Sequence, residues 1–252
     1  MHTSANRCVY FGEYPQSVKA EWVTVTDTTD ARGYYLGSDG CYYARMTASP
    51  DVWQCHSFDD RQKIEMGKDY FFKVEPIKWR VLSEQDGTAL LFCDNILEKH
   101  VFDKDYRPWA TSEIRAFLNG EFYEVAFTAE QKARITETVV DNSVASMGSL
   151  AKRCKMVDGE NTRDKVFLLS YADVTNKAYG FTHPTVKRTA STEYARARGA
   201  RTYEFPYYGC WWLRSPYESG STNVCEVNLN GVHCSSTNVP YLGVVPALRI
   251  RL

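Results

Sequence analysis

The amino-acid sequence predicts an α+β domain, and three observations carry that prediction. Strand-like patterns occur near both ends of the chain, capped helical patterns lie between them, and apolar residues make up 44% of the 252 residues. Together with 24% charged residues, that apolar content is ordinary for a globular protein and argues against a disordered chain. A chain of this length can bury a core of its own, so we expect residues 1–252 to form a single domain.

The N-terminal part is predicted to hold a strand followed by an insertion. Residues 9–16 (VYFGEYPQ) read as a short strand that Pro15 ends, and the closing strand of the chain, residues 244–252, is its expected partner. Residues 17–68 are polar and rich in turn residues, and the GSDG string at residues 37–40 between two Tyr-containing strings predicts a hairpin. We therefore interpret residues 17–68 as an insertion or a small subdomain.

The middle of the chain alternates between strand and helix patterns. Alternating apolar residues predict strands, apolar residues three and four apart predict helices, and Ser or Thr followed three residues later by Gln is a capping box. These rules predict three strands, over 77–82, over 89–93 and over 166–170, the last two of them buried. They also predict a helix from Thr111 or Ser112 that Asn119-Gly120 ends, and a short helix opened by Thr128 and Gln131 that buries Ile135. A further helix is predicted from Ser191 or Thr192 to about Arg198, with Gly199 after it. Two or three helices therefore separate the strands.

The C-terminal part is predicted to be rich in strands, in a mixed or antiparallel sheet. Strands are expected over residues 210–214, 223–229, 232–236 and 244–252. The Asn230-Gly231 pair is a strong hairpin signal, because both residues tolerate positive φ. Within this hairpin, period two places three residues on the expected core face: Cys225, Val227 and Leu229.

Residues 215–238 differ in composition from the strands around them. They hold eleven Ser, Thr or Asn residues, and only Glu218 and Glu226 carry charge. Apolar strings flank the segment, CWWL at 210–213 and VVPAL at 244–248, and several tyrosines lie close by. Stiff aromatic anchors among adaptable polar groups are typical of recognition loops, although solvated turns share the same polar composition.

Charge and hydropathy argue against several classes of protein. The 30 basic and 31 acidic side chains give a net charge of −1, whereas nucleic-acid and membrane-surface binders need a basic excess. The N-terminus lacks the apolar stretch of a secretory signal, and the longest apolar run, residues 89–93, is far shorter than the roughly 20 residues of a membrane helix. We expect no nucleic-acid partner, no membrane insertion, and a cytoplasmic or virion-associated location.

The eight cysteines do not form a metal or disulfide pattern. No Cys-x-x-Cys pair occurs, and the spacing is irregular, as for reduced and mostly buried thiols. Cys225, His233 and Cys234 could bind a metal, but nothing around them resembles the supporting pattern of a metal site. Phosphate-binding loops and His-Glu-x-x-His strings are also absent from the sequence, so we expect no metal, no cofactor and no catalytic residue.

Six separated strings resemble one known family. They are residues 11–16 (FGEYPQ), 76–82 (PIKWRVL), Trp109 with 112–119 (SEIRAFLN), 166–170 (VFLLS), 211–216 (WWLRSP) and 246–250 (PALRI). This ordered set resembles bacterial and phage proteins of the C-type lectin fold that are related in fold to the formylglycine-generating enzyme. Some members are variable proteins of diversity-generating retroelements, in which a reverse transcriptase writes adenine-directed errors into the 3′ end of the gene. The resemblance covers most of the chain except the predicted insertion.

The resemblance implies a fixed frame and a displayed surface within residues 207–252. The frame would consist of Trp211, Trp212, Leu213, Arg214, Pro216, Pro246, Ala247 and Leu248. The ligand-binding positions, variable in diversified members, would be Tyr217, Ser219, Ser221, Asn223, Glu226, Asn228, His233, Ser235 and Asn238. One departure stands out: the family's final strand usually reads GVRPAL, whereas Val245 replaces the arginine here.

The resemblance favours a non-catalytic protein that binds a protein or cell-surface ligand through this surface. A calcium-independent carbohydrate-binding module is an alternative, because Tyr and Trp faces stack on sugars. A calcium-dependent lectin would need several neighbouring carboxylates, and residues 215–238 supply only two. A cysteine oxidase like the formylglycine-generating enzyme would need two of Cys210, Cys225 and Cys234 close together with one activated thiol.

Overall fold

The largest sheet is built around β5 (Asp69–Gln85), a strand of 17 residues. The computed structural model describes residues 7–51, 57–152, 158–203, 206–218 and 222–252. Over these residues the sheet has nine strands in the order β12–β19–β6–β5–β4–β3–β2, with β1 paired to β5 and β9 to β19. The other eight strands are β1 (Cys8–Val18), β2 (Val25–Thr29), β3 (Tyr35–Gly37), β4 (Tyr42–Thr47), β6 (Thr88–Cys93), β9 (Ile135–Thr136), β12 (Val166–Phe167) and β19 (Ala247–Arg251). The chain is mixed α+β, mostly sheet with a few short helices, as the sequence predicts.

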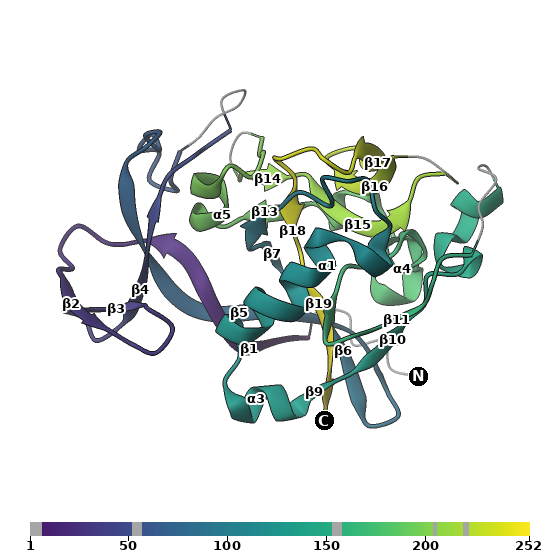
Figure 1. The fold of residues 1–252 in the computed structure, drawn as a ribbon, viewed down its shortest axis with the longest axis horizontal. Coiled ribbons are helices and arrows are strands. Elements are labelled where there is room, and N and C mark those ends of the chain that lie inside the picture. The colour runs from purple at the N-terminus through teal and green to yellow at the C-terminus, as the bar shows by residue number, and fades with distance from the viewer. Residues whose placement is uncertain (1–6, 52–56, 153–157, 204–205, 219–221) are drawn as a thin grey trace.

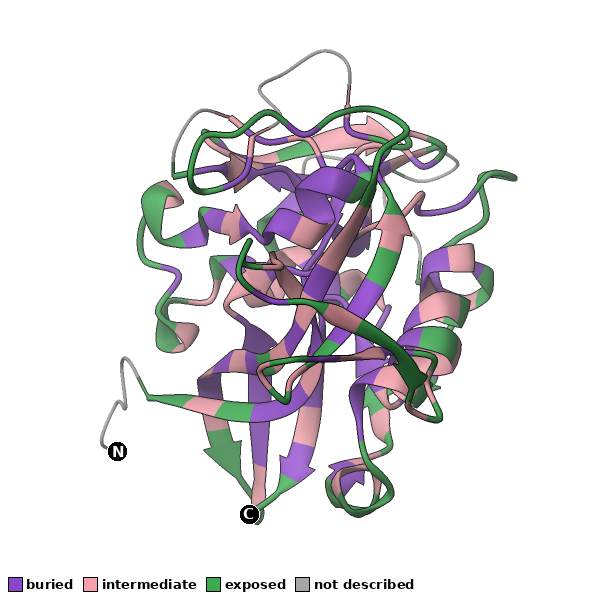
Figure 2. Cartoon of the chain, turned by 90° about the vertical axis from the view of Figure 1, so that its left-hand side faces the viewer, coloured by how far each residue is buried: buried purple, intermediate pink, exposed green. Residues whose placement is uncertain are grey.

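The two strands predicted after residue 76 are confirmed. Ile77 and Trp79 of β5 are fully buried, and β6 is buried from Ala89 to Cys93. The Trp79 indole N–H donates to the carbonyl of Phe11 at 2.7 Å, which joins β1 to β5 beyond their backbone ladder. The alternating pattern therefore marks the centre of the core, and Figure 2 shows buried positions along the strands with exposed ones mainly in the connecting loops.

The prediction that the first and last strands pair is wrong. β19 pairs with β6, β9 and β12, whereas β1 pairs antiparallel with β5 over Phe72 to Arg80. The reason is the length of β5, which offers one edge to β1 while its other edge pairs first with β4 and then with β6. Pro15 does not end the first strand either, since β1 runs on to Val18 with an irregularity after the proline.

Strands β2, β3 and β4 prolong the large sheet at one end of β5. The predicted hairpin is present, with Tyr35 opposite Tyr43. Figure 1 shows these strands at the left, away from the C-terminal strands β15, β16 and β17. This part of residues 17–68 therefore adds strands to the edge of the main sheet.

The helix that begins after Ser112 continues past its predicted end. Ser112 caps α1 (Glu113–Phe117), as predicted, by accepting from the backbone N–H of Arg115. Asn119-Gly120 does not end the helix: the chain passes through a π-helical turn, Leu118–Phe122, into α2 (Tyr123–Ala126). The Asn119 amide group does not terminate the helix but bonds across to β12, donating to the Val166 carbonyl at 2.9 Å.

Two other predicted helix boundaries are confirmed. Thr128 and Gln131 form the capping box of α3 (Ala129–Arg134), and Thr192 caps α5 (Glu193–Arg198), which Gly199 ends with a φ of 105°. The other helical segments are η1 (Trp109–Thr111), η3 (Val144–Lys152), α4 (Tyr171–Thr175), η4 (Lys177–Tyr179) and η5 (Pro184–Lys187). Among the residues that the structure describes, no helix has both the length and the apolar character needed to span a membrane.

A second sheet carries three of the four C-terminal strands predicted from the sequence, and the fourth forms β19 of the large sheet. The second sheet has the strand order β17–β16–β15–β18–β8, and it stands against the large sheet through contacts such as that between Trp211 and Phe92, whose ring centroids lie 5.4 Å apart. Its strands are β8 (Glu98–Lys99), β15 (Trp211–Pro216), β16 (Asn223–Asn228), β17 (Gly231–Ser236) and β18 (Gly243–Val244). Two small sheets complete the fold: β7 (Asn95–Ile96), β13 (Thr189–Ser191) and β14 (Tyr208–Gly209) form one, and β10 (Thr138–Val140) with β11 (Thr162–Asp164) forms the other.

Candidate functional site

The β16–β17 hairpin has one core face and a second, more polar face, on which Val224 is nevertheless buried. Its strands pair in register from Asn223 opposite Ser236 to Asn228 opposite Gly231. Cys225 and Val227 are fully buried, so the predicted core face is confirmed for these two residues. Residues directly opposite each other project to the same side of a sheet. The second face therefore carries Val224, Glu226 and Asn228 of β16 together with the residues opposite them on β17.

Three predicted ligand-binding residues gather on that second face. His233 lies opposite Glu226, and the Ser235 hydroxyl donates to the Glu226 carboxylate at 2.9 Å. His233 is exposed and Ser235 is half-buried. Glu226 was expected to be displayed, but its exposed fraction is only 7%, so it lies within the sheet surface and its carboxylate faces Ser235 instead of solvent.

The other predicted positions are more scattered. Asn228 is half-buried and accepts from the Asn230 N–H, which stabilises the turn. Asn223 is half-buried on the core side of β16, and Tyr217 packs in part against the core. Asn238 is exposed beyond β17 and donates to the Tyr106 hydroxyl at 2.9 Å. Two further predicted positions, Ser219 and Ser221, lie outside the described residues.

The suggested metal ligands do not converge. Cys225 faces Cys234 across the hairpin, and His233 projects to the opposite side because neighbouring residues of a strand alternate. Over the described residues, no group of three His, Cys, Asp or Glu side chains is arranged to hold a metal ion.

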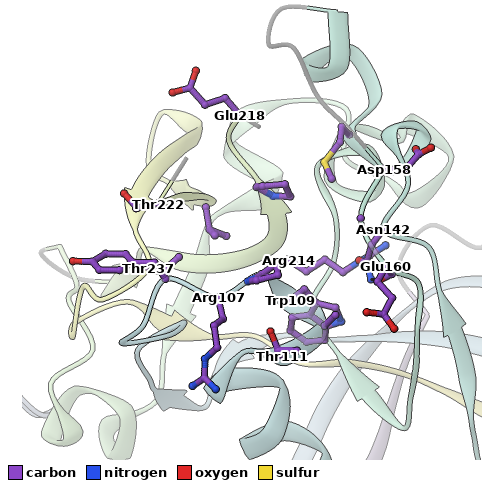
Figure 3. A pocket seen from close by; sticks show the side chains of 17 residues that line it. Arg107, Trp109, Thr111, Asn142, Asp158, Glu160, Arg214, Glu218, Thr222 and Thr237 are labelled. Atoms are coloured by element: carbon purple, nitrogen blue, oxygen red, sulfur yellow. Dashed lines mark hydrogen bonds between the residues drawn. The ribbon is translucent and has the colours of Figure 1, made fainter. Parts of the chain in front are cut away.

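A hollow of about 520 Å³ lies beside this hairpin. Its walls come from the loop before α1, from Asn142, Met147 and residues 158–160, and from strands β15 and β16, and we call it the Trp109 hollow (Figure 3). Pro216, Glu218 and Val224 belong to the segment singled out in the sequence, whereas Arg107 and Glu160 were not predicted. The sequence signals that pointed to this place were the Trp109 and WWLRSP strings of the family resemblance.

The loop that forms one wall is held by a buried aspartate. The Asp103 carboxylate is fully buried and accepts from the backbone N–H groups of Asp105, Arg107 and Glu113, at 2.8–3.0 Å. The guanidinium of Arg107 also donates to it. Burial alone would raise the pKa of Asp103, but these hydrogen bonds outweigh it and hold the pKa below its usual value. The loop is therefore fixed by a carboxylate that remains ionised.

Trp109 is fixed by a second buried carboxylate. Its indole N–H donates to Thr162 Oγ1 and to Asp164 Oδ2, each at 3.1 Å. Asp164 is 1% exposed and also accepts from Arg115 Nε at 2.6 Å. This network joins the loop, α1 and β11, so the indole wall of the hollow is positioned by three elements that are distant in sequence.

Arg214 and Thr237 are buried residues that line the same hollow. The Arg214 guanidinium donates to the Leu168 carbonyl at 2.7 Å, to Asp173 at 3.0 Å and to the Asp141 carbonyl at 3.1 Å. Its Nε has no hydrogen-bond partner among the described residues, and neither has the Thr237 hydroxyl oxygen. Figure 3 shows Arg214 and Trp109 side by side in the centre, with Glu218, Asp158 and Glu160 around them.

Comparison with known protein families places the chain in one of them. A family model described as a domain of unknown function, DUF6273, matches residues 86–252, which is more than half of the sequence. The chain belongs to the DUF6273 family. The matched residues of this DUF6273 protein include the β16–β17 hairpin and every wall of the Trp109 hollow. Searches among curated proteins and among solved structures found no match.

The buried Glu226 makes the stability of this DUF6273 protein depend on pH. Burial raises the pKa of Glu226, although the hydrogen bond from Ser235 and the charges of His233 and Arg201 oppose that rise. Because the pKa of Glu226 is raised in the folded state, the contribution of this group to stability is complete below its pKa in the unfolded chain. It is lost as the pH rises through the pKa of the folded state.

Glu226→Gln is therefore expected to raise the melting temperature at pH 7.5 and to leave it nearly unchanged at pH 4. One pKa unit corresponds to about 1.4 kcal/mol, which sets the scale of the effect. Thermal unfolding at both pH values measures it, with the exposed Glu218→Gln as a control that should change little at either pH. A lower melting temperature for Glu226→Gln at pH 7.5 would mean that the hydrogen bond from Ser235 outweighs the cost of burial.

Proposed function

We propose that this DUF6273 protein is a non-catalytic ligand-binding protein of the C-type lectin fold, akin to the variable proteins of diversity-generating retroelements. Its ligand is a protein or a cell-surface epitope, which it binds through the polar face of the β16–β17 hairpin and the hollow beside it. The observation that carries the proposal is the contrast between frame and surface. The frame residues Trp211, Trp212, Ala247 and Leu248 are all fully buried, whereas His233 and Asn238 are exposed.

This contrast permits ligand contacts to change without changing the fold. The frame strands are held by burial of large apolar side chains, a contribution of about 1.5–3 kcal/mol for each. Exposed polar side chains contribute little to stability, so substitutions among them are tolerated. Val245, which stands where the family usually has arginine, is itself fully buried and so strengthens the apolar frame.

The binding proposal is tested with surface variants and a random peptide library displayed on phage. Peptides are enriched on the wild-type protein and then measured against the triple variant His233→Ala, Ser235→Ala, Asn238→Ala. We expect at least a tenfold loss of affinity, because several contacts of about 1 kcal/mol each are removed. The matched control is Asp27→Ala, Thr28→Ala, Thr29→Ala on the exposed strand β2, which should bind as wild type. Equal binding by both triple variants would refute the proposal.

The link to retroelements has a separate test in the neighbouring DNA. We expect a reverse transcriptase gene and a near-copy of the 3′ coding segment that differs from it only at adenines. Neighbouring DNA without these two elements would remove diversification from the proposal, while the binding function would still be decided by the variants.

A cysteine oxidase is the competing function, since Cys225 lies directly opposite Cys234. Such an enzyme also needs an activated thiol, with a lowered pKa. Burial instead raises the pKa of Cys210 to about 11. Labelling of the native protein with iodoacetamide at pH 7 decides between the two, because the non-catalytic proposal expects no cysteine to react faster than an ordinary exposed thiol.

A further inference from the structure

We propose that the Trp109 hollow is a recognition pocket for a neutral aromatic side chain with a hydrogen-bonding tip, such as tyrosine, in a positively charged segment of a partner protein. The inference rests on the function proposed above and specifies the chemistry of the ligand. It follows from three properties of the hollow: two buried polar atoms without partners, apolar walls, and an acidic rim.

The two unpartnered atoms mark the floor as a place for a hydrogen-bonding group. Four buried side-chain atoms of the described residues lack a hydrogen-bond partner, and two of them, Arg214 Nε and Thr237 Oγ1, belong to residues that line this one hollow. An unpaired buried polar atom costs about 1–3 kcal/mol, and native proteins leave few of them. Both atoms are closed to solvent, so the proposal requires a shift of the floor side chains that brings a ligand within hydrogen-bond distance. The Nε donor requires an acceptor, and the Thr237 hydroxyl can donate or accept.

The charges around the hollow favour a neutral acceptor over an anion. The positive charge of Arg214 is already paired with Asp173, at 3.0 Å. The rim adds three exposed carboxylates, those of Asp158, Glu160 and Glu218. A carboxylate or phosphate entering the hollow would therefore meet an excess of negative charge, whereas a hydroxyl or an amide oxygen would not.

The walls favour a flat apolar group in the ligand, between its hydrogen-bonding tip and the rim of the hollow. Trp109, Met147, Pro216 and Val224 line the hollow, and about 520 Å³ is in the range of pockets that enclose a ligand group. An aromatic ring between these side chains would bury apolar area and could contact the Trp109 indole edge to face. Among the described residues of the rim the basic one is Arg107, which already pairs with Asp103, Asp105 and Glu113. Positive charges beside the ring would therefore find carboxylates at the rim that form no ion pair with another described residue.

Three small molecules, tested on the intact chain, measure the need for the hydroxyl group and the need for the positive charge separately. Tyramine has the phenol and a positive charge, phenethylamine lacks only the hydroxyl, and 3-(4-hydroxyphenyl)propionate carries a negative charge instead. Titration followed by ligand-observed NMR is expected to give the tightest binding for tyramine. We expect binding at least fivefold weaker without the hydroxyl and at least tenfold weaker with the negative charge.

Matched variants assign the binding to the hollow. Thr237→Val should weaken tyramine binding about fivefold and leave phenethylamine binding unchanged. Thr202→Val is the control, because the Thr202 hydroxyl is equally buried and also lacks a partner but does not line the hollow. The exposed rim variant Glu160→Gln, Glu218→Gln should abolish the preference for tyramine over the propionate, and it tests the same pocket without touching the core.

The outcomes distinguish this inference from the proposed function. Equal binding of the three molecules, equal effects of Thr237→Val and Thr202→Val, or tighter binding of a methyl glycoside than of tyramine would each overturn the tyrosine pocket. If that happens while the hairpin triple variant still binds its peptides more weakly than wild type, only the inference of a tyrosine pocket is refuted. If the triple variant binds the peptides as tightly as wild type, the proposed function is refuted, whatever the result with the small molecules.

Discussion

Replacing Trp212 with alanine is expected to lower the free energy of unfolding by about 3–5 kcal/mol, the usual cost of removing a large aromatic side chain from a core. Trp212 has no exposed surface, and its ring packs against Phe102 with centroids 5.6 Å apart. Its indole N–H donates to the His100 carbonyl at 2.9 Å, so the variant also leaves a partly buried acceptor without this partner. Urea denaturation followed by circular dichroism measures the loss.

Trp22→Ala is the matched control for this prediction. Trp22 is 74% exposed, so the same change of residue should alter the free energy of unfolding by less than about 0.5 kcal/mol. A loss below about 1 kcal/mol for Trp212→Ala would show that the frame of the display surface does not depend on this side chain. Peptide binding should fall together with stability in Trp212→Ala, because β15 supports the hairpin that carries His233.

Local patterns predicted the elements of this fold better than their pairing. Strands such as β5 and β6 and the caps at Thr128 and Thr192 depend on residues a few positions apart, and the structure confirms them. The partner of β19 depends on the length of β5 and on which edges remain open, and neither is visible in the pattern of a single strand. The predicted end of the first helix was wrong for a similar reason. The Asn119 side chain donates a hydrogen bond to β12, 47 residues further along the chain.

The candidate site was predictable only in part. Composition singled out residues 215–238, and the hairpin does bring His233 and Ser235 together beside Glu226. The burial of Glu226 was not predicted, because alternation says which face a residue is on and not how deeply the neighbouring segments cover that face. The Trp109 hollow combines segments separated by more than a hundred residues, so no local spacing could reveal it.

Asp164→Ala is expected to cost about 3 kcal/mol of stability and to weaken tyramine binding in the Trp109 hollow. Removing one partner from a buried charged network leaves the other groups unsatisfied, which typically costs 3–5 kcal/mol. Here Arg115 and the Trp109 indole N–H would both lose their carboxylate, although Arg115 is 29% exposed and can be partly rehydrated, which places the loss at the lower end.

Two further variants make this prediction specific. Asp164→Asn keeps an oxygen for the Trp109 indole but removes the charge that Arg115 needs, so it should lose less stability than Asp164→Ala and retain more of the tyramine affinity. Asp27→Ala, at an exposed position of β2, is the control and should match wild type in urea denaturation and in the NMR titration. If Asp164→Ala is destabilised but binds tyramine as wild type does, the carboxylate supports the core without positioning Trp109. The wall of the hollow would then owe its position to the loop that Asp103 holds.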